Sequence, residues 1–404
     1  MFFFNNFDTN NKELTNDYAK NLLNYKEDSF FESNTIEIGY IGNTLAKNGD
    51  KRKYLLTHVN VLASNSDKIK SIVEKCDFDI KNKSQANGWQ LFYLYKELLQ
   101  RFTSNEFGFN YFRGQSVNKP LLPGIMRGEL DKSYINNFER IYRKLAYEFP
   151  EKINYTEFNG ADCITNREYD LSLLQHYGLK TALLDITKNP YIAMLFMIKE
   201  NIREYTEPTL YLFNINELLE KDETLFTEVR KNKTNERILA QKGAFLNYEK
   251  TLLKNNNYEK IPYIKIILRF DDAVYEKLLE NEIKVYENLK KYSKEHGHKD
   301  FESFVDHDLS ELNKQLDSIE EYKVVSLKNI LEDLENKLNE YCYIKEDMFP
   351  DFENRIRYLS NKYNKSGEDA LRYTRSVSIN KKQDWQLIYA SKRSIRVLFA
   401  KLDP

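Results

Sequence analysis

A short run in the first half of the chain combines residue types that can bind a phosphate: Tyr111-Phe112-Arg113-Gly114-Gln115. The aromatic residues predict a strand from Phe109 to Phe112 that enters a Gly turn. Such a strand fixes the backbone of Arg113, and Gly114 lets a ligand approach the chain closely. A guanidinium held in this way can bind a phosphate through two parallel hydrogen bonds. An Arg before a turn Gly is also common as a surface ion-pair residue, and the run alone leaves both roles open.

A second run gathers polar side chains between apolar ones, at Gln175-His176-Tyr177-Gly178-Leu179 and at Leu183-Leu184-Asp185-Ile186-Thr187. Polar groups in apolar surroundings are either hydrogen-bonded for structure or held for function. His176 fits both roles, as a ligand contact or as a core imidazole oriented by a backbone carbonyl. Thr187 and Asn189 precede Pro190, which is typical of the capped start of a helix.

A third run extends from Arg237 to Phe245 and includes Gln241. Taken in order with the first two runs, and with Leu122-Pro123 and Arg127 between them, it resembles the FRG domain family, which is named for its Phe-Arg-Gly motif. The resemblance covers about 89–270. This chain departs from the family pattern of Pro, Arg and Trp by having Lys180, Ala182 and Ile186. The change at Ala182 removes a second cation that the pattern would supply.

The FRG resemblance implies a bacterial effector of phage defence or toxin type, whose core binds a phosphate-bearing ligand. Its target would be a phage or host protein or a nucleic acid, and a toxin would have a neutralising partner. The aromatic-Arg-Gly strand is also, more loosely, similar to the Arg motif of ADP-ribosyltransferases, in which an Arg contacts a phosphate of NAD. This similarity implies NAD as the cofactor and transfer of ADP-ribose to a macromolecule as the reaction.

The similarity to ADP-ribosyltransferases also implies roles for individual residues. It gives catalytic roles to Arg113, His176, Glu236 and Gln241, and cofactor contacts to Arg113, Gly114, Gln115, Tyr177 and Thr187. Arg113 would bind the pyrophosphate, while His176 and Tyr177 would line the nicotinamide pocket. Glu236 or Gln241 would stabilise the charge that develops on the ribose. No Glu-x-Glu or Gln-x-Glu stands at the third run, so Gln241 there predicts altered transfer or none.

A recognition module without catalysis is the competing interpretation. In such a module Arg113 and the run at 175–190 hold the core together. Arg113 would then be tied to a buried carboxylate such as Glu129 or Glu139. The terminal regions would bind the phage or host component.

Composition narrows the classes of function further. With 61 Lys and Arg against 62 Asp and Glu, the net charge of −1 gives no global argument for nucleic-acid or membrane binding. The three Cys are scattered, which predicts neither a disulfide framework nor a zinc site. His296, His298 and His307 lie in a charged stretch typical of solvated chain, so no metal is expected. Because no run approaches 18 apolar residues and the start lacks a signal sequence, we expect a cytoplasmic protein without a membrane partner.

The elements that must position the three runs indicate an α+β fold with a mixed central sheet flanked by helices. Helical spacing of apolar residues predicts helices at 91–102, 136–149, 169–177 and after Pro190, and alternation predicts strands at 36–40, 209–213 and 261–270. We divide the chain into an N-terminal extension (1–88), an FRG-like core (89–270), an acidic helical region (271–350) and a basic C-terminal segment (351–404).

The last two parts carry opposite charge, −10 over 271–350 and +8 over 355–404. The acidic helices and the basic tail can pair or stay solvated, or the tail can bind a polyanion. Two short strands expected at 387–389 and 395–399 favour a tail that joins a sheet.

Overall fold

The computed structural model describes most of the chain up to Pro350. It covers residues 24–43, 53–87, 90–128, 132–199, 201–218, 223–228, 236–253, 258–296 and 299–350, together with 18, 22, 355, 356, 359 and 360. The chain forms two compact units, Met1–Met348 and Phe349–Pro404, and the account below concerns the first. The strands expected at 387–389 and 395–399 lie outside the described residues.

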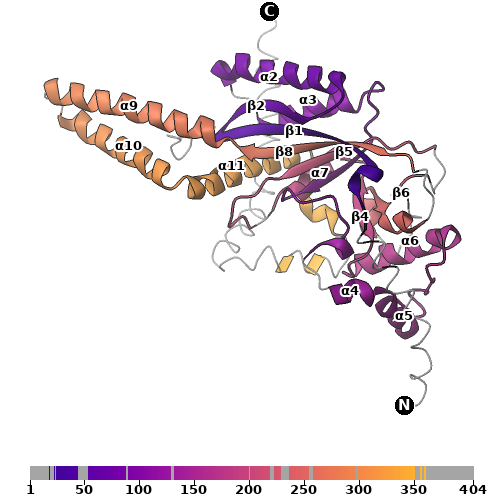
Figure 1. The fold of residues 1–404 in the computed structure, drawn as a ribbon. Coiled ribbons are helices and arrows are strands. Elements are labelled where there is room, and N and C mark those ends of the chain that lie inside the picture. The colour runs from indigo at the N-terminus through magenta and orange to yellow at the C-terminus, as the bar shows by residue number, and fades with distance from the viewer. Residues whose placement is uncertain are drawn as a thin grey trace, which may run out of the picture. The chain divides into compact units, whose positions relative to one another are not determined.

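The first unit is built on one eight-stranded sheet with the order β2-β1-β8-β5-β3-β4-β7-β6 (Figure 1). The strands are β1 (Phe31–Gly42), β2 (Tyr54–Ala63), β3 (Tyr111–Gln115), β4 (Leu183–Thr187), β5 (Thr209–Phe213), β6 (Phe226–Thr227), β7 (Gly243–Asn247) and β8 (Ile261–Phe270). Only β1 and β8 run parallel, and all other neighbours in the sheet are antiparallel. The expected α+β class with a mixed central sheet is therefore confirmed.

In the described part of the chain, helices lie between the strands and, after β8, follow one another. They are α2 (Asp67–Asn87), α3 (Leu91–Phe102), α4 (Lys132–Asn136), α5 (Phe138–Glu148), α6 (Ala161–His176), α7 (Pro190–Met197), α8 (Glu236–Ala240), α9 (Asp272–His296), α10 (Lys299–Asp317) and α11 (Ile319–Glu340). Short 3-10 turns lie at η1 (Glu27–Ser29), η2 (Gly124–Met126), η3 (Tyr248–Leu252) and η4 (Lys345–Met348). No helix in the part of the chain that the structure describes is long and apolar enough to cross a membrane.

The two faces of the sheet carry different helices. Along β3, side chains alternate between the faces, so that Tyr111 points opposite to Gly114. Tyr111 belongs to the apolar core that includes Phe138 of α5 and Leu171 of α6. Gly114 lies directly against the carbonyl of Ala193 in α7. Helices α5 and α6 thus cover one face of the central strands, and α7 covers the other.

Most predicted elements are confirmed. Strands β5 and β8 and helix α3 have the predicted bounds, and the strand predicted at 36–40 is the middle of the longer β1. Helix α6 begins earlier than predicted, and the helix predicted at 136–149 is interrupted at Asn137. The prediction of a Gly turn after Phe112 is wrong, because Arg113, Gly114 and Gln115 continue β3 and pair with β5.

The N-terminal residues contribute directly to the sheet. Strand β1 pairs with β8 over ten consecutive positions, from Phe31–Ile261 to Tyr40–Phe270. Its buried side chains include Ile36, Ile38 and Tyr40. Residues before 89 and residues of the FRG-like core therefore share one sheet, and the part boundaries drawn from the sequence stay predictions.

Candidate functional site

The three runs singled out in the sequence lie on three neighbouring strands. Phe112 on β3 pairs with Thr187 on β4, and Thr187 pairs with Gly243 on β7. The Thr187 hydroxyl donates a hydrogen bond of 2.7 Å to the carbonyl oxygen of Gln241. The fold thus brings the backbones of all three runs together at the centre of the sheet.

The Arg113 side chain makes a second connection between the first two runs, next to the pair Phe112–Thr187. The register of β3 and β4 contains the single pair Phe112–Thr187. Further along, the Arg113 guanidinium donates a 2.6 Å hydrogen bond to the carbonyl oxygen of Asp185. The Asp185 carboxylate accepts a 2.9 Å hydrogen bond from the Gln175 amide, whose oxygen accepts from the Thr181 hydroxyl at 2.5 Å. Gln175 and Asp185 therefore tie the end of α6 to the strand that Arg113 contacts.

The surroundings of Arg113 are poor in acceptors. Part of its side chain reaches solvent, but its Nε is buried and has no hydrogen-bond partner among the described residues. The same holds for Nε2 of Gln115, two positions along β3 on the same face. Burial lowers the pKa of Arg113; Asp185 opposes this effect, whereas the nearby charge of Arg127 adds to it. The unpaired donors of Arg113 and Gln115 therefore lie on one face of β3, and the Arg127 guanidinium, whose Nε donates a 3.2 Å hydrogen bond to the carbonyl oxygen of Leu122, is close enough to act on the charge of Arg113.

The other predicted cofactor contacts have varied surroundings. Gly114 packs against α7, so its missing side chain serves helix packing. Tyr177 is exposed, with the Lys152 ammonium 5.8 Å from its ring centroid. Thr187 uses its hydroxyl within the protein, because it also accepts a 3.0 Å hydrogen bond from the backbone N–H of Asn189.

The remaining predicted catalytic residues lie at the end of α6 and at α8 or directly after it. His176 ends α6, is buried, and packs edge-on against the Tyr177 ring. Gln241 follows α8, and its amide donates a 3.0 Å hydrogen bond to the carbonyl oxygen of Met348. The side chain of Glu236 lies outside the described part of the structure. A shared ligand contact for Arg113, His176 and Gln241 stays a prediction.

Arg113 does not have the carboxylate partner Glu139 expected for it in a purely structural role. Arg113 contacts a backbone carbonyl, and Glu139 is bound by Arg167 instead. Glu129 lies outside the described residues. Asn189, by contrast, acts as the helix cap that the sequence predicts, since its side chain accepts from the N–H groups of Tyr191 and Ile192. A clustered metal site of three His, Cys, Asp or Glu side chains does not occur within the described ranges.

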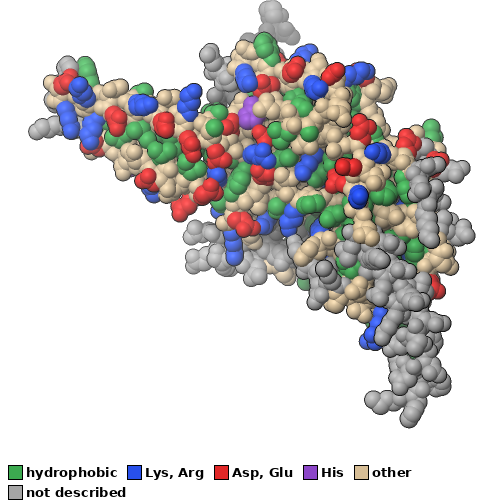
Figure 2. Space-filling view, in the orientation of Figure 1, with side chains coloured by type: hydrophobic (Ala, Val, Ile, Leu, Met, Phe, Trp, Pro, Cys, Tyr) green, Lys and Arg blue, Asp and Glu red, His purple; other side chains and the backbone are tan. Residues whose placement is uncertain are grey.

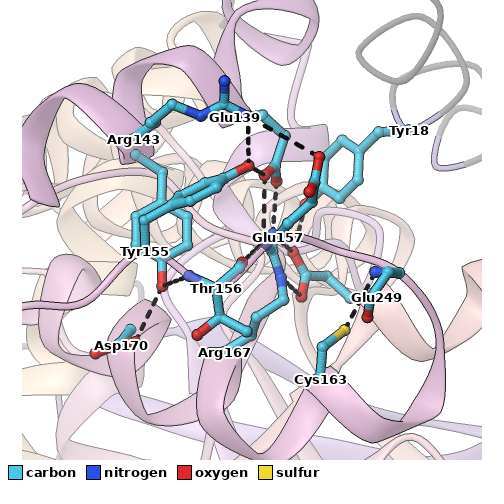
Figure 3. A network of polar contacts seen from close by, with 12 residues as sticks. Tyr18, Glu139, Arg143, Tyr155, Thr156, Glu157, Cys163, Arg167, Asp170 and Glu249 are labelled. Carbon is cyan, nitrogen blue, oxygen red and sulfur yellow. Dashed lines mark hydrogen bonds and ion pairs between the residues drawn. The ribbon is translucent and has the colours of Figure 1, made fainter. Parts of the chain in front are cut away.

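A buried ionic network on α6 was missed in the sequence (Figure 3). Arg167 is fully buried, and its guanidinium contacts the carboxylates of Glu249 and Glu139. The contact with Glu249 is bidentate, at 3.0 and 2.7 Å, and that with Glu139 is at 3.2 and 2.6 Å. One arginine in the core is therefore shared by two acids from distant parts of the chain.

Tyrosines complete the network. Tyr18 donates a 2.8 Å hydrogen bond to Glu249 and stacks on Phe138, while Tyr155 donates one of 2.9 Å to Glu139. Burial opposes the charge of Arg167, but the two carboxylates raise its pKa above the ordinary value. Burial also raises the pKa of Glu139, and Arg167 offsets only part of that effect. The network holds α6, which leads to His176, firmly against η3.

The raised pKa of Glu139 predicts a pH-dependent stability. Its contribution is present below the ordinary value of 4.5 and is lost as the pH rises through the raised pKa, because the folded state then holds a buried charge. Relative to Glu139→Gln, the wild type should therefore lose free energy of unfolding between about pH 4 and about pH 8. Urea unfolding at both pH values measures this difference.

Glu207 provides a control of opposite sign. Burial opposes its charge, but hydrogen bonds from Arg269 and Asn118 lower its pKa. Relative to Glu207→Gln, the wild type should gain stability as the pH rises from below the lowered pKa to about pH 5, just above the ordinary value of 4.5, and should stay level from there to about pH 8. If the stability of the wild type relative to each variant changed with pH in the same direction, the raised pKa of Glu139 would be contradicted.

Comparison with known proteins identifies one segment of the chain. Residues 109–206, about a quarter of the chain, match the model of the FRG domain family. The match includes the first two runs and ends before the third run at 237–245. No curated protein and no solved structure matches the chain. The similarity to ADP-ribosyltransferases gains no support from these comparisons and stays a prediction.

Proposed function

We propose that the FRG domain binds a phosphate-bearing ligand beside Arg113, Gln115 and Arg127. The observation that supports this is the set of donors on one side of β3: Nε of Arg113 and Nε2 of Gln115 are buried, and no described residue provides an acceptor for them. Buried polar groups are normally hydrogen-bonded, and two guanidinium groups that repel each other are relieved by an anion between them. A phosphate would satisfy both requirements.

NAD is the first candidate ligand, in a bacterial effector of phage defence or toxin type. The FRG match and the position of Arg113 support this choice. NAD would supply a nicotinamide–ribose bond, whose cleavage releases nicotinamide while a nucleophile of the target macromolecule bonds to the ribose. Arg113 would hold the pyrophosphate. Gln241 already donates its amide to Met348, so transfer has less support than binding.

A non-catalytic recognition module is the second candidate. Polar groups from all three runs bind one another or the backbone: Gln175 binds Asp185, Thr187 binds Gln241, and Arg113 binds the Asp185 carbonyl. Such closed contacts are typical of groups that hold a structure together. The two candidates share the phosphate site and differ in whether the bound ligand is cleaved.

The decisive experiment measures the melting temperature with NAD, ADP-ribose or inorganic pyrophosphate, and the release of nicotinamide in a cell lysate with labelled NAD. Ligand at about 100 times its Kd should stabilise the wild type by about 2.7 kcal/mol. Arg113→Ala should weaken binding by roughly 10- to 100-fold, because a charged hydrogen-bond donor is lost. Without ligand, its stability should change by only about 1 kcal/mol. Arg101→Ala, in an ion pair with Glu97 on α3, is the matched control.

Each outcome separates the candidates. Stabilisation together with nicotinamide release and labelling of a macromolecule supports transfer. Stabilisation without release supports the recognition module. If none of the three probes raises the melting temperature, or if Arg113→Ala binds as well as Arg101→Ala does, the phosphate site is wrong.

A further inference from the structure

Helices α9 and α10 form a hairpin (Figure 1). The hairpin lies outside the residues that match the FRG domain family. The start of α9 is anchored, since Tyr275 packs on Phe270 with ring centroids 5.1 Å apart. Further along, the hairpin closes through Tyr286, which donates to Asp308, and through Lys290, whose ammonium lies 2.6 Å from Asp306. Beyond Leu279, no α9 side chain that the structure describes is fully buried.

An uncharged stripe runs along α9 beside the surface that faces α10. Its residues follow the alternating spacing of four and three that is typical of a coiled-coil seam: Val274, Leu278, Asn281, Val285, Asn288 and Tyr292. All except Leu278 are exposed, with Val285 at 55% and Tyr292 at 54%. The stripe extends over about 27 Å of helix, which is long enough for a partner helix of about five turns.

On one side of this stripe the nearest flanking positions are all lysines, and the exposed Glu280 and Glu287 lie one position further out. Lys277, Lys284 and Lys291 stand one heptad apart and directly precede the stripe positions Leu278, Val285 and Tyr292. All three lysines are exposed, and none has an ion-pair partner among the residues described. Figure 2 shows Lys and Arg side chains along the α9 side of the hairpin, with Asp and Glu side chains among them. The three lysines next to the stripe contrast with the net charge of −10 over 271–350.

We propose that the α9 stripe docks an amphipathic helix of another protein, one with an apolar seam flanked by acidic residues. The seam would cover the apolar side chains of α9, and its carboxylates would lie opposite the three lysines. Asn281 and Asn288 would fix the register, as polar residues do at coiled-coil core positions. Charge argues against the chain's own basic segment, which carries +8 over 355–404, and against a second α9 packed antiparallel, which would bring lysine against lysine.

The test uses the full chain and two labelled helical peptides of three heptads. Both peptides have the same Leu and Ile seam, and one has Glu at every flanking position while the other has Lys. Fluorescence anisotropy should show that the Glu peptide binds at least about tenfold more tightly than the Lys peptide, with affinity that falls as salt rises. Exchanging the three lysines for glutamates, by Lys277→Glu, Lys284→Glu and Lys291→Glu, should reverse the preference.

A matched pair of variants tests the stripe itself. Val285→Asp should abolish binding of the Glu peptide, whereas Val325→Asp on α11, where the valine is 49% exposed, should leave it intact. Circular dichroism checks that both variants keep their fold. Equal binding of the two peptides, binding that survives Val285→Asp, or no binding of the Glu peptide would overturn the proposal. Concentration-dependent self-association that Val285→Asp removes would assign the stripe to a second copy of the chain and would also overturn it.

Discussion

Arg167→Met should lower the free energy of unfolding by about 3–5 kcal/mol, because it leaves the carboxylates of Glu139 and Glu249 in the core without their cation. Arg167 and Glu249 are both fully buried, so water cannot replace the lost partner. A loss of this size is a large part of the roughly 5–15 kcal/mol that holds a typical domain together. Urea unfolding followed by far-UV circular dichroism measures it.

Two further variants show whether the unpaired charges are the cause. Arg143→Met removes a cation from the edge of the same network, where its side chain is 37% exposed, and should cost at most about 1 kcal/mol. Adding Glu139→Gln and Glu249→Gln to Arg167→Met removes all three charges and should recover part of the loss. A cost for Arg167→Met no larger than that for Arg143→Met would contradict the buried network.

The sequence predicted elements well where burial repeats with a regular period. The run 261–270 alternates β-branched and apolar residues, and 91–102 has apolar residues on one helical face, so both were found with their true bounds. Strand β4 was not recognised, because Asp185 and Thr187 interrupt its apolar residues. The pairing of β1 with β8 joins residues some 230 positions apart, and local periodicity carries no information on such a contact.

Only part of the candidate site was predicted, because local sequence does not show which distant residues come together. The sequence singled out Arg113 because a Gly follows it, and in the structure this residue of β3 binds the backbone of β4 through its guanidinium. Arg167 escaped notice although a signal exists: it occupies the apolar stripe of α6, between Ile164 and Leu171. A charged residue at such a position implies a buried partner, but only the fold shows which acids approach it.

The second large loss of stability is expected on substitution of Gly114, the Gly of the Phe-Arg-Gly motif. In Gly114→Ala, the new Cβ would lie 1.8 Å from the carbonyl oxygen of Ala193 and 2.8 Å from its carbonyl carbon. Both are backbone atoms of α7, so the whole helix must move, together with its buried Ala193, Met194 and Met197. We expect the free energy of unfolding to fall by on the order of 3 kcal/mol, at the upper end for overpacking.

Gly128→Ala is the control, because a Cβ at that exposed position meets no atom within 4 Å. Its free energy of unfolding should lie within about 0.5 kcal/mol of that of the wild type. The comparison also separates the two explanations for this Gly. If Gly114 serves only to let a ligand approach, Gly114→Ala should remain as stable as Gly128→Ala and lose the NAD-induced rise in melting temperature. Because the Ala193 carbonyl already fills the space beside Gly114, we expect the loss of stability instead, with α7 rather than a ligand as the reason that this position has no side chain.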